Sequence, residues 1–234
     1  MAAKNVLMVF TNHAKIEGTD IDTGYYLPEA AHPYQRFKKA GFNVQFASPT
    51  GGATFITPAS IDLTDEENKI FYEDAALRAE TDNSKPLSAF NGNDFDIVFF
   101  VGGFGTMWDF PLDENVQRLQ REVYEKGGIV GAVCHGPIAL ANTKLSSGEL
   151  LIAGKEVAGF TEEEEAVAGI KGHLPMHEGA GQSCEEVLLA RGGKYTKGPA
   201  WGSHVVVDSR IITGQNPASA AGVGDAIVVA AANL

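Results

Sequence analysis

Short apolar runs recur along the chain, and longer stretches of mixed polar and apolar residues separate them. Residues 5–10 (NVLMVF), 43–49 (NVQFASP), 95–103 (FDIVFFVGG) and 128–134 (GIVGAVC) form the clearest runs. Runs of this kind are typical of strands that are buried on both faces of a parallel sheet. Shorter strands are predicted near Val157 and at residues 205–207 and 211–213.

The stretches between these runs indicate helices. One predicted helix ends at Gly41, and two others cover 65–80 and 113–128. A further helix is predicted to begin with Gly136 and Pro137, in GPIALANTK. A closing helix is predicted with Asn216 as its cap and Pro217 in its first turn. Alternating strands and helices predict an α/β fold with a parallel sheet. Because the chain contains no internal repeat and no low-complexity linker, we expect residues 1–234 to form a single domain.

Composition and charge indicate which classes of molecule the protein is expected to bind. The chain has 234 residues, 44% of them hydrophobic, and a formal net charge of −12. Such an acidic chain repels phosphate backbones and anionic membrane surfaces, so we expect neither nucleic acid nor membrane as a partner. The apolar run at 6–10 is too short for a signal peptide, and two cysteines make a disulfide framework improbable. We therefore expect a cytoplasmic protein, with the nucleus as an additional compartment.

The stretch AVCHGP, residues 132–137, places Cys134 where a buried strand gives way to a predicted helix. A sharp strand-to-helix turn projects one side chain over the carboxyl edge of the sheet, where ligands of open α/β folds bind. The dipole of the following helix is expected to lower the pKa of the cysteine. A small buried core cysteine is the alternative, but it explains neither His135 nor the Gly-Pro pair. The other cysteine, Cys184, lacks such a setting and is interpreted as structural.

Two further stretches carry candidate chemistry. VGGFGT, residues 101–106, follows the preceding strand and should lie beside Cys134, so that the backbone N–H groups of Gly103 and His135 could form an oxyanion hole. A simple tight turn is the alternative. In YYLPEAAHP, Glu29 lies in a largely apolar stretch, where burial would raise its pKa and suit it to proton transfer. A solvated glutamate at a helix start is an equally good interpretation.

Taken together, these motifs resemble the ThiJ/PfpI superfamily. TGYYLPEAAHPY, AVCHGP, GFTEEEE and TGQNPASA are similar to the branch that contains yeast heat-shock chaperones acting as glyoxalase III, over residues 6–220. The resemblance implies a flavodoxin-like α/β sandwich with helices on both faces, a homodimer, and a Cys-His-acid triad with an additional glutamate. Cys134 then matches the nucleophile, His135 the adjacent histidine and Glu29 the additional glutamate. Within the run 162–165, Glu165 fits the acidic triad member best.

The function that follows is conversion of methylglyoxal, a small dicarbonyl, to lactate through a cysteine hemithioacetal, without glutathione or any cofactor. Chaperone or protein deglycase activity in a stress response is compatible with it. The alternatives are a holdase chaperone without turnover and a cysteine peptidase or amidotransferase, although the chain lacks the H-x-E pair that an amidotransferase needs.

The segment 173–186 (HLPMHEGAGQSCEE) departs from the usual apolar helix of the family, which puts the pocket wall near it in doubt. His173 and His177 within it are four residues apart, but without a third ligand they predict no metal site.

Overall fold

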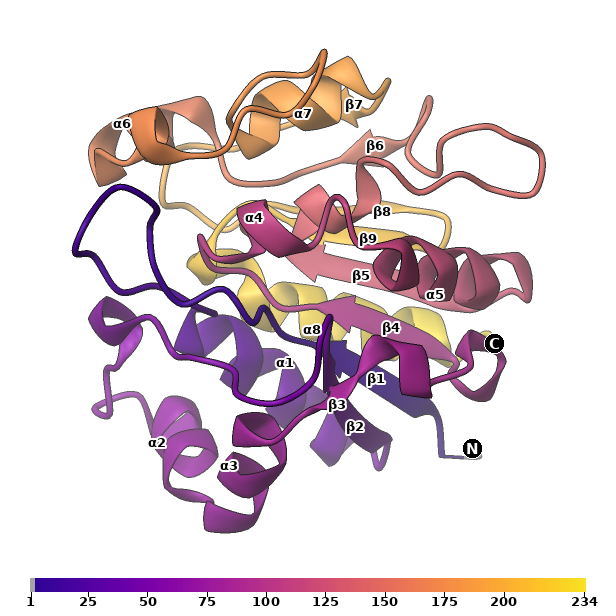
Figure 1. Cartoon of the computed structure of the whole chain (residues 1–234). Helices are drawn as coiled ribbons and strands as arrows, with labels where there is room; N and C mark the ends of the chain where they lie inside the picture. Colours follow the sequence, from indigo (N-terminus) through magenta and orange to yellow (C-terminus); the bar gives the residue numbers. More distant parts are fainter. Residues whose placement is uncertain (1–2) are drawn as a thin grey trace.

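A seven-stranded sheet lies at the centre of the computed structural model, which describes residues 3–234 (Figure 1). The strand order is β3-β2-β1-β4-β5-β9-β8, and β8 alone runs antiparallel to its neighbour in this sheet. The strands are β1 (Asn5–Val9), β2 (Asn43–Ser48), β3 (Lys85–Pro86), β4 (Ile97–Phe100), β5 (Ile129–Val133), β8 (Val205–Asp208) and β9 (Ile211–Gly214). Every residue of β4 and β5 is buried, as the uniformly apolar runs predicted.

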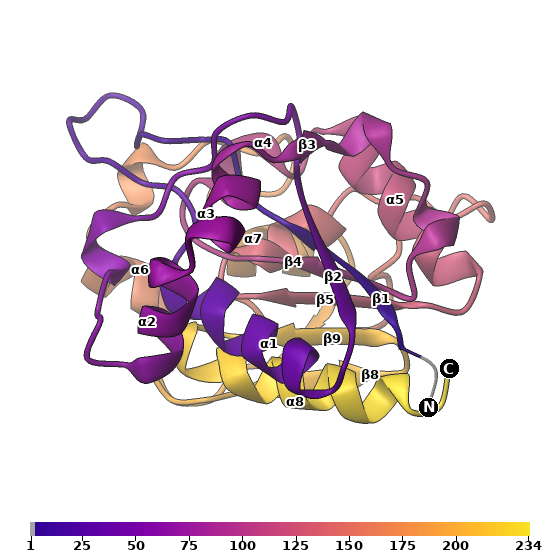
Figure 2. The same ribbon diagram turned by 90° about the horizontal axis from the view of Figure 1, so that it is seen from below.

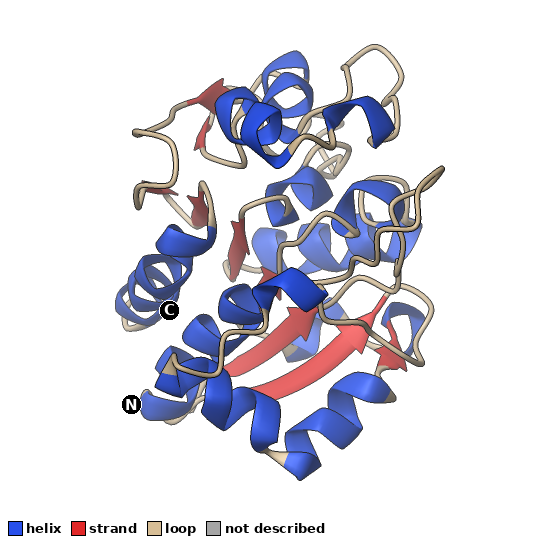
Figure 3. Cartoon of the chain, turned by 90° about the vertical axis from the view of Figure 1, so that its left-hand side faces the viewer, coloured by secondary structure: helices blue, strands red, loops and turns tan. Residues whose placement is uncertain are grey.

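Helices cover both faces of the sheet (Figures 2 and 3). On one face α1 (Leu27–Lys39) packs against α8 (Ala220–Ala231), with α2 (Glu66–Glu73) outside α1, and α5 (Glu114–Glu125) lies on the other face. The remaining helices are α3 (Ala75–Asp82), α4 (Thr106–Asp109), α6 (Glu162–Ala168) and α7 (Cys184–Ala190). A second small sheet pairs β6 (Glu156–Val157) with β7 (Lys194–Tyr195). The predicted α/β sandwich is thus confirmed.

Short 3-10 helices connect several of these elements. They cover Pro58–Ser60, Leu87–Ala89, Gly92–Asp94, Gly136–Leu140, Lys171–His173 and Pro217–Ser219. The segment just before β1 lies beside the C-terminal end of the chain, and the Lys4 ammonium group donates a hydrogen bond of 3.0 Å to the Leu234 carbonyl (Figure 2). No helix within residues 3–234 has both the length and the apolar composition needed to span a bilayer.

Local sequence explains where α5 and α6 begin and end. The Asp113 side chain accepts the N–H groups of Asn115 and Val116 and so caps α5. At α6, Thr161 and Glu164 form a reciprocal capping box, and Gly169 ends the helix in the left-handed conformation with φ of 73°. The acidic run 162–165 therefore has a defined place in the fold, in the first turn of a short helix.

The single helix predicted over 65–80 is wrong, because the structure has two helices there. Asp74 interrupts the stretch with an extended backbone, and its side chain accepts the N–H groups of Ala76 and Leu77. An aspartate that caps the second helix competes with continuation of the first.

The helices predicted after Gly136 and at the C-terminus also differ from the structure. Gly136–Leu140 is a 3-10 helix of 5 residues, and the closing α-helix begins at Ala220 after another short 3-10 helix. Asn216 precedes that 3-10 helix, but its amide does not bond to the helix N–H groups. Its side chain contacts Glu164 and the Gly202 carbonyl instead, a tertiary role that local spacing does not reveal.

Candidate active site

A strained turn carries Cys134 at the carboxyl end of β5. Cys134 has a φ of 62°, a left-handed conformation that costs energy for a residue with a side chain. Its N–H donates to the Gly214 carbonyl at 2.9 Å, and its carbonyl accepts the Phe160 N–H at 2.8 Å. Gly136 lets the chain pass close to β4, because a Cβ there would lie 2.5 Å from the Phe100 carbonyl oxygen. These contacts fix the turn that the sequence predicted as an elbow.

Three side chains form a continuous polar chain from this turn. The Cys134 Sγ lies 3.4 Å from His135 Nδ1, and His135 Nε2 lies 2.7 Å from Glu165 Oε1. All three residues are buried, with exposures of 4%, 1% and 0%. A carboxylate at one imidazole nitrogen orients the ring and stabilises its protonated form, while the other nitrogen faces the thiol. The arrangement has the geometry of a nucleophile, a base and an orienting acid.

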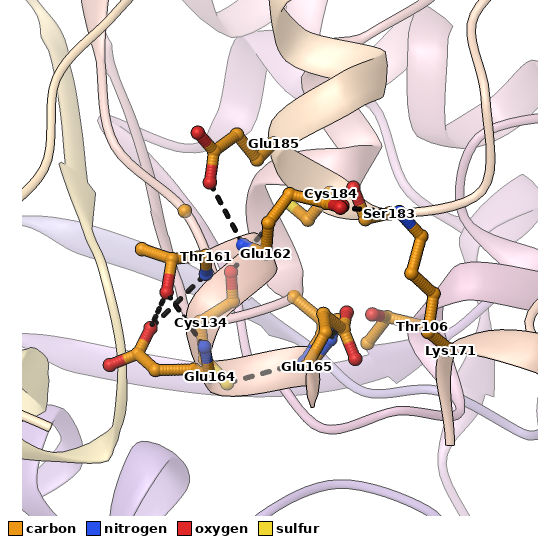
Figure 4. Close-up of polar contacts among 12 residues, drawn as sticks. Thr106, Cys134, Thr161, Glu162, Glu164, Glu165, Lys171, Ser183, Cys184 and Glu185 are labelled. Carbon is orange, nitrogen blue, oxygen red and sulfur yellow. Dashed lines mark hydrogen bonds and ion pairs between the residues drawn. The ribbon is translucent and has the colours of Figure 1, made fainter. Parts of the chain in front are cut away.

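The other glutamates of the run 162–165 point elsewhere. Glu162 pairs with Lys171, and Glu163 is exposed. Glu164 is buried and faces Thr161, in a different direction from Glu165 (Figure 4). Glu165 is therefore the carboxylate of this run that meets the imidazole of His135.

Glu29 is fully buried near the start of α1, after Pro28. Among residues 3–234, neither of its carboxyl oxygens receives a hydrogen bond from a nitrogen or oxygen donor. The Cys134 thiol is the polar group that faces it, and both lie against Gly102, where a Cβ would be 2.2 Å from Glu29 Oε2 and 2.9 Å from the Cys134 Cβ. Burial raises the pKa of Glu29 well above its usual range, with the thiol acting weakly against this rise.

The predicted lowering of the Cys134 pKa is wrong for this closed site. Burial and the neighbouring Glu29 carboxyl raise the pKa of the thiol well above its usual value, and the His135 backbone N–H opposes this only in part. The prediction relied on the dipole of a following α-helix, whereas the structure has only a short 3-10 helix there. Ionisation of both Glu29 and Cys134 at the same time is thus unfavourable, and the pair retains a proton at neutral pH.

A cavity of about 170 Å³ opens next to the sulfur. Gly103 and His135, the predicted oxyanion donors, both line it together with Cys134. Gly103 has a φ of 120° and lies against the segment before α1, because a Cβ would meet the Gly24 carbonyl oxygen at 2.3 Å. The loop after β4 thus contributes backbone to the same cavity as the Cys134 sulfur. The remaining lining residues are Tyr26, Phe104, Phe160, Ala168, Trp201 and Pro217.

The aromatic wall of this cavity was missed by the sequence analysis. The ring centroids of Phe104 and Phe160 lie 4.5 and 4.3 Å from that of His135, and Trp201 lies 5.7 Å from Phe160. Phe104 and Phe160 occur inside the motifs VGGFGT and GFTEEEE, so their position beside those motifs was the available signal. Trp201 lies in a loop between β7 and β8, and no local pattern connects it with Cys134.

The second cysteine and the two spaced histidines do not line this cavity. Cys184 is fully buried in the first turn of α7, and burial raises the pKa of its thiol. The cavity is lined by no residue of the segment 173–186, in which the sequence departs from the family pattern. In the part of the chain that the structure describes, no group of three His, Cys, Asp or Glu side chains is placed to hold a metal ion.

Comparison with known proteins places these features in a family. The sequence model of the DJ-1/PfpI family matches residues 21–230. Glyoxalase 3 of Candida albicans is 34% identical over 232 residues, which cover 96% of this chain and 97% of the relative. The glutathione-independent glyoxalase HSP31 of Saccharomyces cerevisiae is 35% identical over 233 residues, which cover 94% of each chain.

Solved structures agree with these sequence matches. The crystal structure of glyoxalase III from Candida albicans has a TM-score of 0.88 at 33% identity and covers 97% of both chains. The Rapid Encystment Protein of 24 kDa from Francisella tularensis has a TM-score of 0.92 at 38% identity, with 97% of this chain and 99% of that chain covered. The structural similarity therefore extends over nearly the whole chain, and the residues matched by the family model, 21–230, include all those that line the cavity.

Proposed function

The chain belongs to the DJ-1/PfpI family, and from this premise we propose that it is a glutathione-independent glyoxalase that converts methylglyoxal to lactate. One observation carries the proposal: at a small cavity, the Cys134 thiol has two buried groups beside it. One is the imidazole of His135, which is paired with Glu165, and the other is the carboxyl of Glu29. A thiol supplied by the protein replaces the thiol of glutathione.

In the first step the Cys134 sulfur attacks the aldehyde carbon of methylglyoxal and a carbon–sulfur bond forms. The thiol proton passes to His135 Nδ1, which is 3.4 Å from the sulfur, and then to the aldehyde oxygen. Glu165, at 2.7 Å from Nε2, stabilises the transient imidazolium. The product is a hemithioacetal that carries a hydroxyl on the carbon bound to sulfur. His135 thus removes the thiol proton as the sulfur attacks. The reaction therefore does not require that Cys134 be a thiolate before substrate binds.

In the second step Glu29 moves a hydrogen between the two carbons. Its protonated oxygen gives a proton to the ketone oxygen while its other oxygen accepts the proton of the carbon bound to sulfur, which yields an enediol. Glu29 then returns the proton to the neighbouring carbon and accepts the hydroxyl proton next to sulfur. The result is a thioester of lactate and a Glu29 that is protonated again. Burial raises the pKa of Glu29, which favours this protonated form.

In the last step water attacks the thioester carbonyl with His135 as the base. The carbon–sulfur bond breaks, lactate leaves, and the proton returns to the Cys134 sulfur. Backbone N–H groups of Gly103 and His135, which line the cavity, are the proposed donors to the oxyanion. The balance is one water consumed for each lactate formed, with no oxidant, reductant, metal or cofactor.

The resemblance to the family also supports a homodimer and a cytoplasmic location, with a small dicarbonyl as the substrate. Light scattering coupled to gel filtration tests the first: a mass twice that of the 24.8 kDa chain is expected, and a monomeric mass contradicts it.

The function itself is tested by incubating purified protein with methylglyoxal in the absence of glutathione and any other thiol. We expect lactate to accumulate in proportion to the methylglyoxal consumed. Consumption without lactate, or lactate formation only after glutathione is added, would contradict the proposal.

A further inference from the structure

The wall of the cavity is aromatic and carries no positive charge. Phe104, Phe160 and Trp201 form a connected set of rings, with centroid distances of 5.9 Å between the two phenylalanines and 5.7 Å between Phe160 and Trp201. None of the lining residues is Lys or Arg within the described chain, 3–234. The sulfur has His135 Nδ1 at 3.4 Å and the Glu29 carboxyl as a neighbour, and Glu165 contacts the other nitrogen of the imidazole. The cavity lining thus offers an apolar surface and no Lys or Arg that could pair with an anionic substituent.

Trp201 is held at the rim of this cavity. Its side chain lines the cavity yet is 48% exposed, so one part of the indole faces the interior and another faces solvent. The backbone of Trp201 has a φ of 62°, a conformation that is unusual for a bulky residue and that persists only when the surroundings enforce it.

A single carboxylate enforces that conformation. Glu164 Oε1 accepts the Trp201 N–H at 2.7 Å, the Asn216 side-chain amide at 2.7 Å and the Gln215 amide at 3.1 Å. Its other oxygen accepts the Thr161 hydroxyl at 2.9 Å. Burial alone would raise the pKa of Glu164, but the hydrogen bonds from Asn216, Gln215 and the Trp201 N–H outweigh it, so that the pKa is lowered. Because α6 carries both Glu164 and Glu165, the Trp201 loop is tied to the helix that orients His135. Glu164 is a positioning residue in this arrangement.

From these contacts we propose that the site prefers 2-oxoaldehydes with a neutral aryl substituent over those with an anionic substituent, and that Trp201 determines this preference. The inference rests on the proposed glyoxalase function and specifies its substrate class. An aryl ring gains contact with the aromatic wall in addition to its burial. A carboxylate or phosphate on the substituent would be desolvated against the aromatic wall, where no lining residue is a Lys or Arg that could pair with it.

The size of the cavity is compatible with such a substituent. A dry cavity of about 150 Å³ in another protein admits benzene, and the cavity here measures about 170 Å³ and is open at the rim formed by Trp201. An aryl group can therefore lie against the rings of the wall, with the two carbonyl groups at the sulfur.

The test compares kcat/KM for methylglyoxal, phenylglyoxal and 4-carboxyphenylglyoxal, the last two matched in shape and different in charge. We expect phenylglyoxal to exceed its carboxylate analogue by at least about tenfold, which corresponds to ~1.4 kcal/mol. Trp201→Ala should lower kcat/KM for phenylglyoxal about threefold to tenfold more than for methylglyoxal, mainly through KM, and Trp201→Phe should recover part of the loss. Val229→Ala, a change at an exposed residue of α8 that does not line the cavity, should leave the ratio between substrates unchanged.

The outcomes separate the two levels of the argument. Equal kcat/KM for phenylglyoxal and its carboxylate analogue would overturn the preference. If Trp201→Ala changes the ratio of kcat/KM for phenylglyoxal to that for methylglyoxal by less than twofold, the role of Trp201 is overturned. In either case, turnover of methylglyoxal would still support the proposed function. If none of the three compounds is converted to a hydroxy acid, the proposed function and the preference fail together. The circular dichroism spectrum of each variant confirms that the fold is retained.

Discussion

Glu29 and Cys134 share a buried surrounding in which ionising both groups at once is unfavourable. Burial raises the pKa of each, and neither Glu29 oxygen has a nitrogen or oxygen donor among residues 3–234 to favour its charged form. A carboxyl whose pKa is raised by burial is favoured in its protonated form, which can both donate and accept a proton within one catalytic cycle. At the residue scale the proposed chemistry therefore depends on this pair more than on an unusually acidic cysteine.

Glu29→Gln tests the acid–base role directly. The amide keeps the shape of the side chain but cannot carry a proton between the two carbons. Because general acid–base catalysis contributes about 10²–10⁴-fold, kcat for methylglyoxal should fall by that range. Steady-state kinetics measures it, and a decrease smaller than about threefold would leave Glu29 with a structural role.

The same substitution should change how stability depends on pH. Above the usual pKa of a glutamate, the unfolded chain loses the Glu29 proton while the folded chain keeps it, so wild-type stability falls as pH rises toward the raised folded pKa. Glu29→Gln removes this contribution. The difference in thermal midpoint, variant minus wild type, should thus be larger at pH 8 than at pH 4.5. Each kcal/mol of change in the free energy of unfolding corresponds to about 2–4 °C. A difference that does not change with pH would contradict the raised pKa.

The two cysteines should differ in reactivity although burial raises the pKa of both. Cys134 lines the cavity and has His135 Nδ1 at 3.4 Å as a base, whereas Cys184 has no exposed surface. Limiting iodoacetamide at pH 7 should alkylate Cys134 first, as peptide mass spectrometry would detect. Equal or faster labelling of Cys184 would argue against an accessible nucleophile.

At the scale of elements, the turns after β4 and β5 determine the site geometry. Gly102 lies where these turns meet α1, because a Cβ there would be 2.2 Å from Glu29 Oε2 and 2.3 Å from the Val133 carbonyl oxygen. Close approach of three segments at one glycine leaves no space for a larger residue.

Gly102→Ala should therefore displace Glu29 or Cys134 and lower kcat at least about 100-fold, since misplacement by about 1 Å has that effect. It should also lower stability by roughly 1–3 kcal/mol through overpacking. Gly172→Ala is the matched control, because a Cβ there meets nothing within 4 Å. Kinetics and urea denaturation measure both effects, and a Gly102→Ala variant as active as the control would show that the turn tolerates movement.

At the scale of the whole molecule, much of the fold follows from local pattern. The apolar runs at 95–103 and 128–134 contain β4 and β5, and the alternation with helices predicted the parallel sheet. What local pattern did not reveal depends on tertiary contacts. Asp74 caps a new helix, Asn216 bonds to Glu164, and Trp201 reaches the cavity from a distant loop. The burial that reverses the expected pKa shift of Cys134 likewise arises only when separate segments pack together.

The assembled molecule should also work without metal or glutathione. The proposed steps use only side chains and backbone of this chain, so activity should survive dialysis against a strong chelator. Lactate formation before and after dialysis measures this. Loss of activity that zinc restores would contradict the proposed mechanism.

The most direct test of the central claim compares lactate formation from methylglyoxal by Cys134→Ala and Cys184→Ala, without added thiol. Both cysteines are buried and close in space, since Cys184 Sγ lies 3.7 Å from the Cys134 carbonyl oxygen, so packing effects are matched. Covalent catalysis by Cys134 predicts that lactate formation is abolished in Cys134→Ala and retained in Cys184→Ala. A Cys134→Ala variant that keeps a substantial fraction of wild-type kcat would contradict the account.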